Sequence, residues 1–282
     1  MMIRIGEMNQ FIVLRKSDLG YMLTNKEDQI LLHFNQTNNR ELELNSMIEC
    51  FVQYDSKGRI SATLEEPSVT ISKPGWAQIV EVNPRLGIFI SINTFKDILI
   101  SKDDLPQDVH FWPHVGEKVL VSLFLKKDRL NGRLLNKQEI IKLNGRVPKL
   151  ELGSKINARL VRVSNNALNA VTEELHYIYI SSKQFRGIHH IGEEVNLMVI
   201  GFHEDEIVAS LNKEKQEMVP LDEEMILAYI KKNGSMPYTA KTDSKTIEEV
   251  FHMSRKAFKR ALGDLYKKHL VYFDDDTTYL VK

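Results

Sequence analysis

The sequence predicts a mainly β protein with a C-terminal α+β domain. From the N-terminus to residue 211, short stretches that alternate apolar with polar residues recur in three groups of five, and this alternation is typical of strands. After Leu221 the apolar residues recur at helical spacing instead. A sheet of five short strands leaves two free edges unless it closes, so we expect each group to form a small barrel.

The central group, residues 67–144, shows the alternation most clearly. Its first strand is expected at Trp76–Val82, and a turn at Asn83–Gly87 leads into a second at Ile88–Ile92. The other strands are expected at Ile98–Ser101, from Val119 onward and at Asn131–Leu134.

Two of these strands carry a resemblance to a known domain. Gly87-Ile-Phe-Ile90 is similar to the Gly-Ala-Phe-Val of the second strand in S1 RNA-binding domains, which are OB-folds. Ile98-Leu-Ile-Ser101 is similar to their Val-His-Ile-Ser, except that Leu99 replaces the histidine. The resemblance implies an S1-like OB-fold barrel whose outer face stacks bases, with one stacking position altered at Leu99.

The flanking groups repeat this plan. Residues 1–66 form a degenerate copy, with strands expected at Met8–Leu14, Tyr21–Leu23, Ile30–Phe34, Ile48–Tyr54 and Arg59–Thr63. In residues 145–217, Ile191-Gly-Glu-Glu-Val195 repeats Val115-Gly-Glu-Lys-Val119 at a domain-sized interval. The strands of this third copy are expected at Gly153–Val163, Leu168–Val171, Tyr177–Ser181, from Val195 onward and at Ile207–Leu211. We expect Glu65–Pro67 and Lys142–Pro148 to be the linkers.

Residues 218–282 are expected to form three helices and a hairpin. Asp222, Ser244 and Ser254 each precede a run with helical periodicity, where a short polar residue caps a helix N-terminus. Leu270–Phe273 and Tyr279–Val281 flank an Asp-rich turn. Three helices followed by a hairpin is the winged-helix plan, whose third helix commonly contacts nucleic acid.

The order of three tandem S1-like OB-fold barrels followed by a winged helix, together with the segment Glu248–Lys268, resembles the conserved virulence factor B family of Gram-positive bacteria. The resemblance implies a protein that binds RNA and takes part in controlling gene expression.

Composition narrows the function classes. The chain has 38 basic and 38 acidic residues, so any nucleic-acid surface must be local. Its single cysteine, Cys50, excludes an internal disulfide and cannot alone provide a zinc site. No apolar run approaches the length of a membrane span, and the N-terminus lacks the plan of a signal peptide. We therefore expect a cytoplasmic protein without a membrane partner.

Four ring-bearing side chains are candidates for base stacking on the barrel faces. Phe89 lies between two isoleucines and faces outward if these fill the barrel. The third-strand position of the S1 pattern assigns His33 in the first barrel and Tyr179 in the third. Phe124 shares the side of its strand that carries lysines. The alternative for these side chains is packing inside the protein or against a neighbouring domain.

One face of the expected third helix is strongly basic. Its candidate phosphate-binding side chains are Arg255, Lys256, Lys259, Arg260 and Lys267. Spacings of one, four and five residues place the first four on one side of the helix. We expect them to contact phosphates, and the alternative is a solvated helix face.

Catalytic signatures are missing from the sequence. It has no Gly-x-x-x-x-Gly-Lys phosphate loop, no Gly-x-Ser-x-Gly elbow and no His-Glu-x-x-His motif. His110, His114 and the pair His189-His190 lack partners at metal-ligand spacing, so we interpret them as loop histidines. We expect no enzyme, no cofactor, no metal and no small-molecule substrate.

The resulting hypothesis is a non-enzymatic protein that binds single-stranded RNA and regulates gene expression after transcription. Two alternatives stay open. One is a DNA-binding regulator whose winged helix contacts duplex nucleic acid. The other is a scaffold that docks on a larger machine and barely touches nucleic acid.

Overall fold

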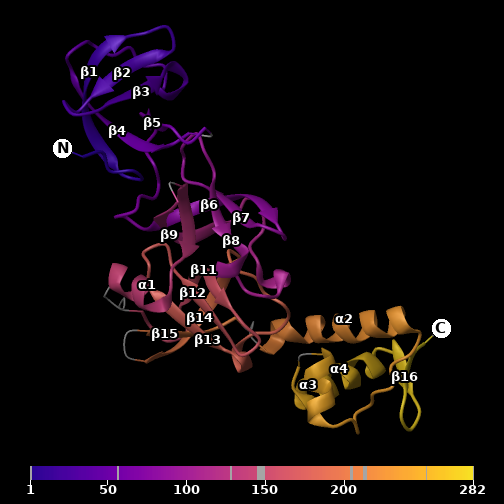
Figure 1. Cartoon of the computed structure of the whole chain (residues 1–282). Helices are drawn as coiled ribbons and strands as arrows, with labels where there is room; N and C mark the ends of the chain where they lie inside the picture. Colours follow the sequence, from indigo (N-terminus) through magenta and orange to yellow (C-terminus); the bar gives the residue numbers. More distant parts are fainter. Residues whose placement is uncertain are drawn as a thin grey trace.

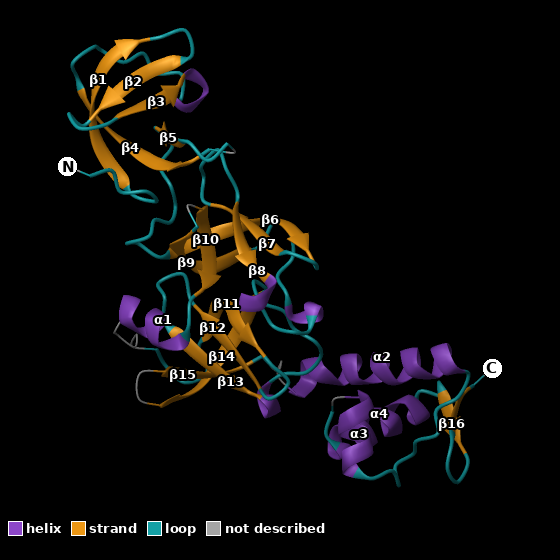
Figure 2. Ribbon diagram, in the orientation of Figure 1, coloured by secondary structure: helices purple, strands orange, loops and turns teal. Residues whose placement is uncertain are grey.

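The computed structural model describes residues 2–55, 57–127, 129–144, 150–203, 206–211, 215–251 and 253–281. Within these residues, three closed five-stranded barrels are followed by a helical domain with a two-stranded sheet (Figures 1 and 2). In Figure 1 the first barrel projects from the second, and the C-terminal domain extends to one side. The predicted fold class, mainly β with three S1-like OB-fold barrels and a winged helix, is confirmed.

The three barrels share one strand order. The first consists of β1 (Met8–Lys16), β2 (Gly20–Thr24), β3 (Gln29–His33), β4 (Met47–Tyr54) and β5 (Ile60–Thr63). The second consists of β6 (Gly75–Asn83), β7 (Gly87–Ser91), β8 (Ile98–Ser101), β9 (Lys118–Lys126) and β10 (Arg129–Leu134). The third consists of β11 (Lys155–Val163), β12 (Ala167–Val171), β13 (Tyr177–Ser181), β14 (Glu194–His203) and β15 (Glu206–Ser210). In each, the third and fifth strands pair in parallel and close the barrel.

The first strand of each barrel carries the same irregularity. The register shifts after Val13 in β1, after Ile79 in β6 and after Leu160 in β11. An extra residue at such a bulge bends the strand and increases its twist. The first strand pairs with a neighbour along each of its edges and has to curve around a small barrel. The bend at the bulge allows this, so the bulge is part of how the barrel closes.

The second barrel shares its core with both neighbours. Phe51 of β4 is fully buried and belongs to the same cluster as the inward isoleucines of the second barrel. Ile191, from the repeated Gly-Glu motif of the third barrel, belongs to this cluster as well. The backbone N–H of Ile191 donates to the carbonyl of Phe111 at 3.0 Å. The second barrel is therefore packed against the first and against the third through apolar contacts.

A helix that the sequence analysis missed lies between the second and third barrels. α1 (Lys137–Leu143) begins with a capping box, in which Asn136 and Glu139 each accept from the other's backbone N–H. Its Ile140 is fully buried in a cluster with residues of β9, β11 and β13. The predicted linker Lys142–Pro148 therefore begins inside a helix, and its residues 145–148 lie outside the described residues.

The C-terminal domain consists of α2 (Lys215–Asn233), α3 (Ser244–Phe251), α4 (Arg255–Lys267), β16 (Val271–Phe273) and β17 (Thr278–Leu280). Ser254 caps α4 as predicted. Asp222 does not begin a helix, because α2 starts at Lys215 and Asp222 is fully buried within it. Asp243 caps α3 in place of Ser244, since its carboxylate accepts from the backbone N–H of Thr246 at 3.0 Å.

Among the helices that the structure describes, none has the length and apolarity of a membrane span.

Candidate nucleic-acid interface

The outer face of the second barrel places two candidate residues in one row across the sheet. Phe89 is half-buried, and its two neighbours in β7 are fully buried isoleucines. The strand register pairs Phe89 with Leu99, Leu99 with Asn131, and Asn131 with Phe124. Paired residues share a face of the sheet, so Phe89 and Phe124 lie on the same outer surface, three strand spacings or about 14 Å apart.

The third barrel carries a different row. Tyr179 is half-buried and pairs with Asn169 on one side and Val208 on the other. Asn169 therefore takes the place that Phe89 has in the second barrel, and Tyr179 takes the place of Leu99. Next in the row is Arg162, which pairs with Asn169 and is exposed. A ring and a guanidinium in one row, separated by Asn169, can stack a base and contact a phosphate.

The first barrel corrects the assignment of His33. The register pairs His33 with Gly20, just as it pairs Ser101 with Gly87 in the second barrel. His33 is therefore equivalent to Ser101 and not to the histidine of the S1 pattern. That position belongs to Leu31, two residues earlier in β3.

The side chain of His33 has a capping role. Its Nδ1 accepts from the backbone N–H of Asn35 at 3.2 Å and begins a short 3-10 helix, Phe34–Gln36. Ser101 begins the 3-10 helix Lys102–Asp104 in the same way. The assignment of His33 from the sequence took Asn35 as the counterpart of the serine in the S1 pattern, and the register shows that this choice was two residues too late.

A groove of about 400 Å³ lies beside His33, between the first barrel and the loop of the second that holds Phe95 and Lys96. The Lys96 ammonium donates to the carbonyls of Tyr54 at 3.1 Å and Asp55 at 3.2 Å. His33 is half-buried and lines this groove. The ammonium of Lys96, which also lines it, already has hydrogen-bond partners.

The basic face of α4 divides into free and paired side chains. Lys256 and Lys259 are exposed and make no ion pair with any residue that the structure describes. Arg260 lies 3.5 Å from the carboxylate of Asp222, and Lys267 lies 3.6 Å from that of Asp264. Arg255 is half-buried, and its guanidinium donates to the carbonyl of Lys241 at 3.2 Å. The freely available positive charge of this candidate set is therefore concentrated at Lys256 and Lys259.

The partner of Arg260 also joins the winged helix to the third barrel. Asp222 forms a second ion pair with Arg186, which lies in the loop between β13 and β14. The side chain of Asp222 is only 1% exposed, and a buried carboxylate requires such cationic partners. Arg260 thus has a structural contact that helical spacing alone could not reveal.

Sequence reasoning missed an exposed aromatic cluster next to the lysines. Tyr266 of α4 is 52% exposed and Phe273 of β16 is 43% exposed, with their ring centroids 5.0 Å apart. Tyr266 stands two helical turns after Lys259, on the same side of α4. The sequence contained a signal for the exposure of Tyr266, because this residue lies outside the apolar stripe of the helix. The surface around Lys259 therefore combines positive charge with stackable rings.

Comparisons with known proteins agree with this architecture. A model of the S1 domain matches residues 5–65, a model described as the CvfB first S1-like domain matches residues 75–134, and a model of the CvfB-like winged helix domain matches residues 224–280. YitL of Bacillus subtilis, an uncharacterized protein, is 30% identical over 279 residues, which cover 98% of this chain and 93% of that protein. The chain belongs to the conserved virulence factor B family.

Further relatives match most of the chain. Conserved virulence factor B of Staphylococcus epidermidis is 26% identical over 246 residues, covering 86% of this chain and 82% of the relative. A crystal structure from Streptococcus pneumoniae, described as a multidomain protein with nucleic acid binding domains, shares the fold with a TM-score of 0.66 and 24% identity over 98% of both chains. This member of the conserved virulence factor B family consists of S1 and winged-helix domains. Nucleic-acid binding is the function that these two kinds of domain have in common.

Proposed function

We propose that the chain binds single-stranded RNA without catalysing a reaction, and that it regulates gene expression after transcription in the cytoplasm. The observation that carries the proposal is the position of Phe89. It lies half-buried on the outer face of an S1 barrel, between two fully buried isoleucines. Stacking of one base on such a ring is worth about 1–3 kcal/mol and tolerates any base.

Charge on the winged helix supports the proposal. Lys256 and Lys259 are free to contact phosphates, and the ring of Tyr266 lies on the same side of the helix. Weak sites on one chain raise the overall affinity because the second contact forms at a high effective concentration. The regulatory role rests on membership of the conserved virulence factor B family.

The test is binding of labelled single-stranded RNA and duplex DNA of equal length to the full chain, at about 50 and about 200 mM salt. We expect RNA to bind more tightly than duplex DNA. Phe89→Ala is expected to weaken RNA binding by about 1–3 kcal/mol. The matched control is Phe202→Ala, which removes a ring that is 44% exposed but lies outside the candidate row.

A second pair of variants tests the phosphate contacts. The double substitution Lys256→Gln and Lys259→Gln is expected to lower the salt slope of RNA binding by about 1.4, because each phosphate contact on a single strand contributes about 0.7. Lys231→Gln with Lys232→Gln makes the same charge change at the exposed end of α2 and should leave the slope unchanged.

Two results would replace the proposal. Tighter binding of duplex DNA than of RNA would favour a DNA-binding regulator. If neither nucleic acid binds below about millimolar concentration at low salt, which is weaker than typical non-specific binding, a docking scaffold becomes the better explanation.

A further inference from the structure

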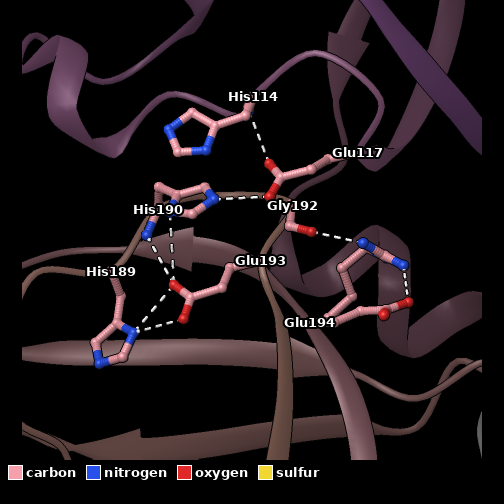
Figure 3. A network of polar contacts seen from close by, with 8 residues as sticks. His114, Glu117, His189, His190, Gly192, Glu193 and Glu194 are labelled. Carbon is pink, nitrogen blue, oxygen red and sulfur yellow. Dashed lines mark hydrogen bonds and ion pairs between the residues drawn. The ribbon is translucent and has the colours of Figure 1, made fainter.

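The junction of the second and third barrels brings together His114 and His190, which the sequence analysis interpreted as loop histidines, and Glu117 of the Gly-Glu motif (Figure 3). His114 and Glu117 precede β9, and His190 precedes β14. Each of the three offers one ligand atom, a ring nitrogen or a carboxylate oxygen, and these three atoms lie within 4.8 Å of one another. His190 Nε2 is 2.8 Å from a Glu117 carboxylate oxygen, and the rings of His114 and His190 stack with centroids 3.9 Å apart.

The repeated Gly-Glu motif fixes the carboxylates of this cluster. The backbone N–H of His114 donates to Glu117 at 2.7 Å, and that of His190 donates to Glu193 at 3.3 Å. The same turn thus occurs in both barrels, and Figure 3 shows the two turns meeting face to face. Glu193 lies 3.6 Å from the Nδ1 of His190 and adds a second negative charge at the edge of the cluster.

The cluster is sheltered but accessible. The side chains of His190 and Glu117 are 18% and 23% exposed, while His114 is exposed. Partial burial reduces competition from water, and the exposed histidine provides an entry path. Two imidazole nitrogens and one carboxylate oxygen are a donor set that suits Zn²⁺, with the fourth tetrahedral position left to water or another carboxylate.

We propose that His114, Glu117 and His190 bind a zinc ion that ties the second barrel to the third. Ligand atoms bound to tetrahedral zinc at about 2.0–2.1 Å lie roughly 3.4 Å from one another. The 2.8 Å separation of His190 and Glu117 must then widen slightly, and the ring of His114 must turn out of its stack.

A zinc ion bound at this site would stabilise the junction between the second and third barrels. Its ligands come from two barrels, so the free energy of metal binding stabilises the packed arrangement of the pair. The outer rows that hold Phe89 and Tyr179 belong to these same two barrels. Zinc would therefore hold the two rows in one relative orientation.

The test is equilibrium binding of Zn²⁺ to the full chain after chelator treatment and removal of any affinity tag. We expect about one Zn²⁺ per chain, a rise in the melting temperature with added Zn²⁺, and a tetrahedral visible spectrum when Co²⁺ replaces it. Glu117→Gln and His190→Ala are each expected to weaken binding roughly tenfold or more and to remove the Co²⁺ spectrum. Circular dichroism of each variant checks that it folds.

The matched control is His110→Ala. His110 lies in the same connection between β8 and β9 as His114, but its ring is hydrogen-bonded to Asp108 and takes no part in the cluster. The control should bind Zn²⁺ as the unchanged chain does. Absence of binding below about millimolar Zn²⁺, full binding by Glu117→Gln, or loss of binding in His110→Ala alone would each overturn the proposal.

Discussion

The first and second barrels have the same backbone plan and different outer surfaces. At the start of the second strand, Gly20 in one and Gly87 in the other pair with the last residue of the third strand. A Cβ atom at either glycine would lie 2.1 Å or 2.0 Å from a backbone carbonyl oxygen of that strand. On the outer face, however, Met22 stands in the first barrel where Phe89 stands in the second.

This comparison distinguishes the residues that close the barrel from the residues that determine what its outer face can bind. Close backbone approach and buried alternate residues determine the closed sheet in both barrels. The outer row contributes little to closure, so its residues can vary without loss of the fold. The third barrel also combines a closed sheet with a different outer row, although Ala167 stands at its glycine position.

The largest effect is expected from placing a Cβ atom at these glycines. Gly87→Ala should destabilise the second barrel by about 2–3 kcal/mol, because the new atom forces the backbone apart. Both tryptophans of the chain, Trp76 and Trp112, belong to the second barrel or its junction. Tryptophan fluorescence during urea unfolding therefore measures this change.

Gly20→Ala provides the parallel measurement in the first barrel. Cys50 is the chain's only cysteine, and burial raises the pKa of its thiol to about 12. Gly20→Ala should speed thiol labelling of Cys50 while leaving the tryptophan transition nearly unchanged. Gly263→Ala is the control, since its Cβ meets nothing within 4 Å and alanine favours helix by about 0.5–1 kcal/mol. If Gly87→Ala leaves the stability unchanged, the second barrel can begin its second strand in the way that the third barrel does at Ala167.

An intermediate effect is expected from giving the first barrel a ring. Met22→Phe places a phenylalanine where the second barrel has Phe89. We expect RNA affinity to rise by about 1 kcal/mol, the lower end of a single stacking contact. Titration of the full chain with labelled RNA measures this. Met47→Phe adds the same ring at a position in β4 that is 68% exposed and outside the row, and a similar gain there would indicate nonspecific stacking.

The smallest effect concerns the ion pair that joins β10 to α1. Hydrogen bonding to Arg133 lowers the pKa of Glu139 from 4.5 to about 2. Because the folded-state pKa is lowered, the pair stabilises the fold above pH 4.5 and loses this contribution as the pH falls toward 2. Both side chains are about a third exposed, which limits the contribution to about 1 kcal/mol.

Urea unfolding at pH 6 and pH 3 measures the contribution of this pair. The unchanged chain should lose more stability between the two pH values than Arg133→Gln, by somewhat over half of this contribution of about 1 kcal/mol, because pH 3 is still above the folded-state pKa. Arg129→Gln, a substitution at an exposed arginine on the same strand, should behave like the unchanged chain. Equal pH dependence of the unchanged chain and Arg133→Gln would show that the pair adds no stability.

The strands could be predicted from the sequence because their signal is local. Alternation and turn residues placed every strand of the second barrel within a few positions, and Phe89 could be assigned to the outer face from two adjacent isoleucines. Side chains that depend on distant partners could not be predicted in this way. Glu117 and His190 are 73 residues apart, and Asp222 and Arg186 are 36 apart. α1 was missed although its capping box is visible in the sequence.

Ile191 has a consequence for how the chain can be divided. It belongs to the third barrel by sequence, yet its side chain is 3% exposed within the core of the second. A fragment that ends before the third barrel would lose this side chain and leave a void, and one that begins there would expose it to water. Phe51 of the first barrel lies in the same core, so limited proteolysis should release the three barrels as one resistant piece, and gene fragments for expression are best cut after the third barrel.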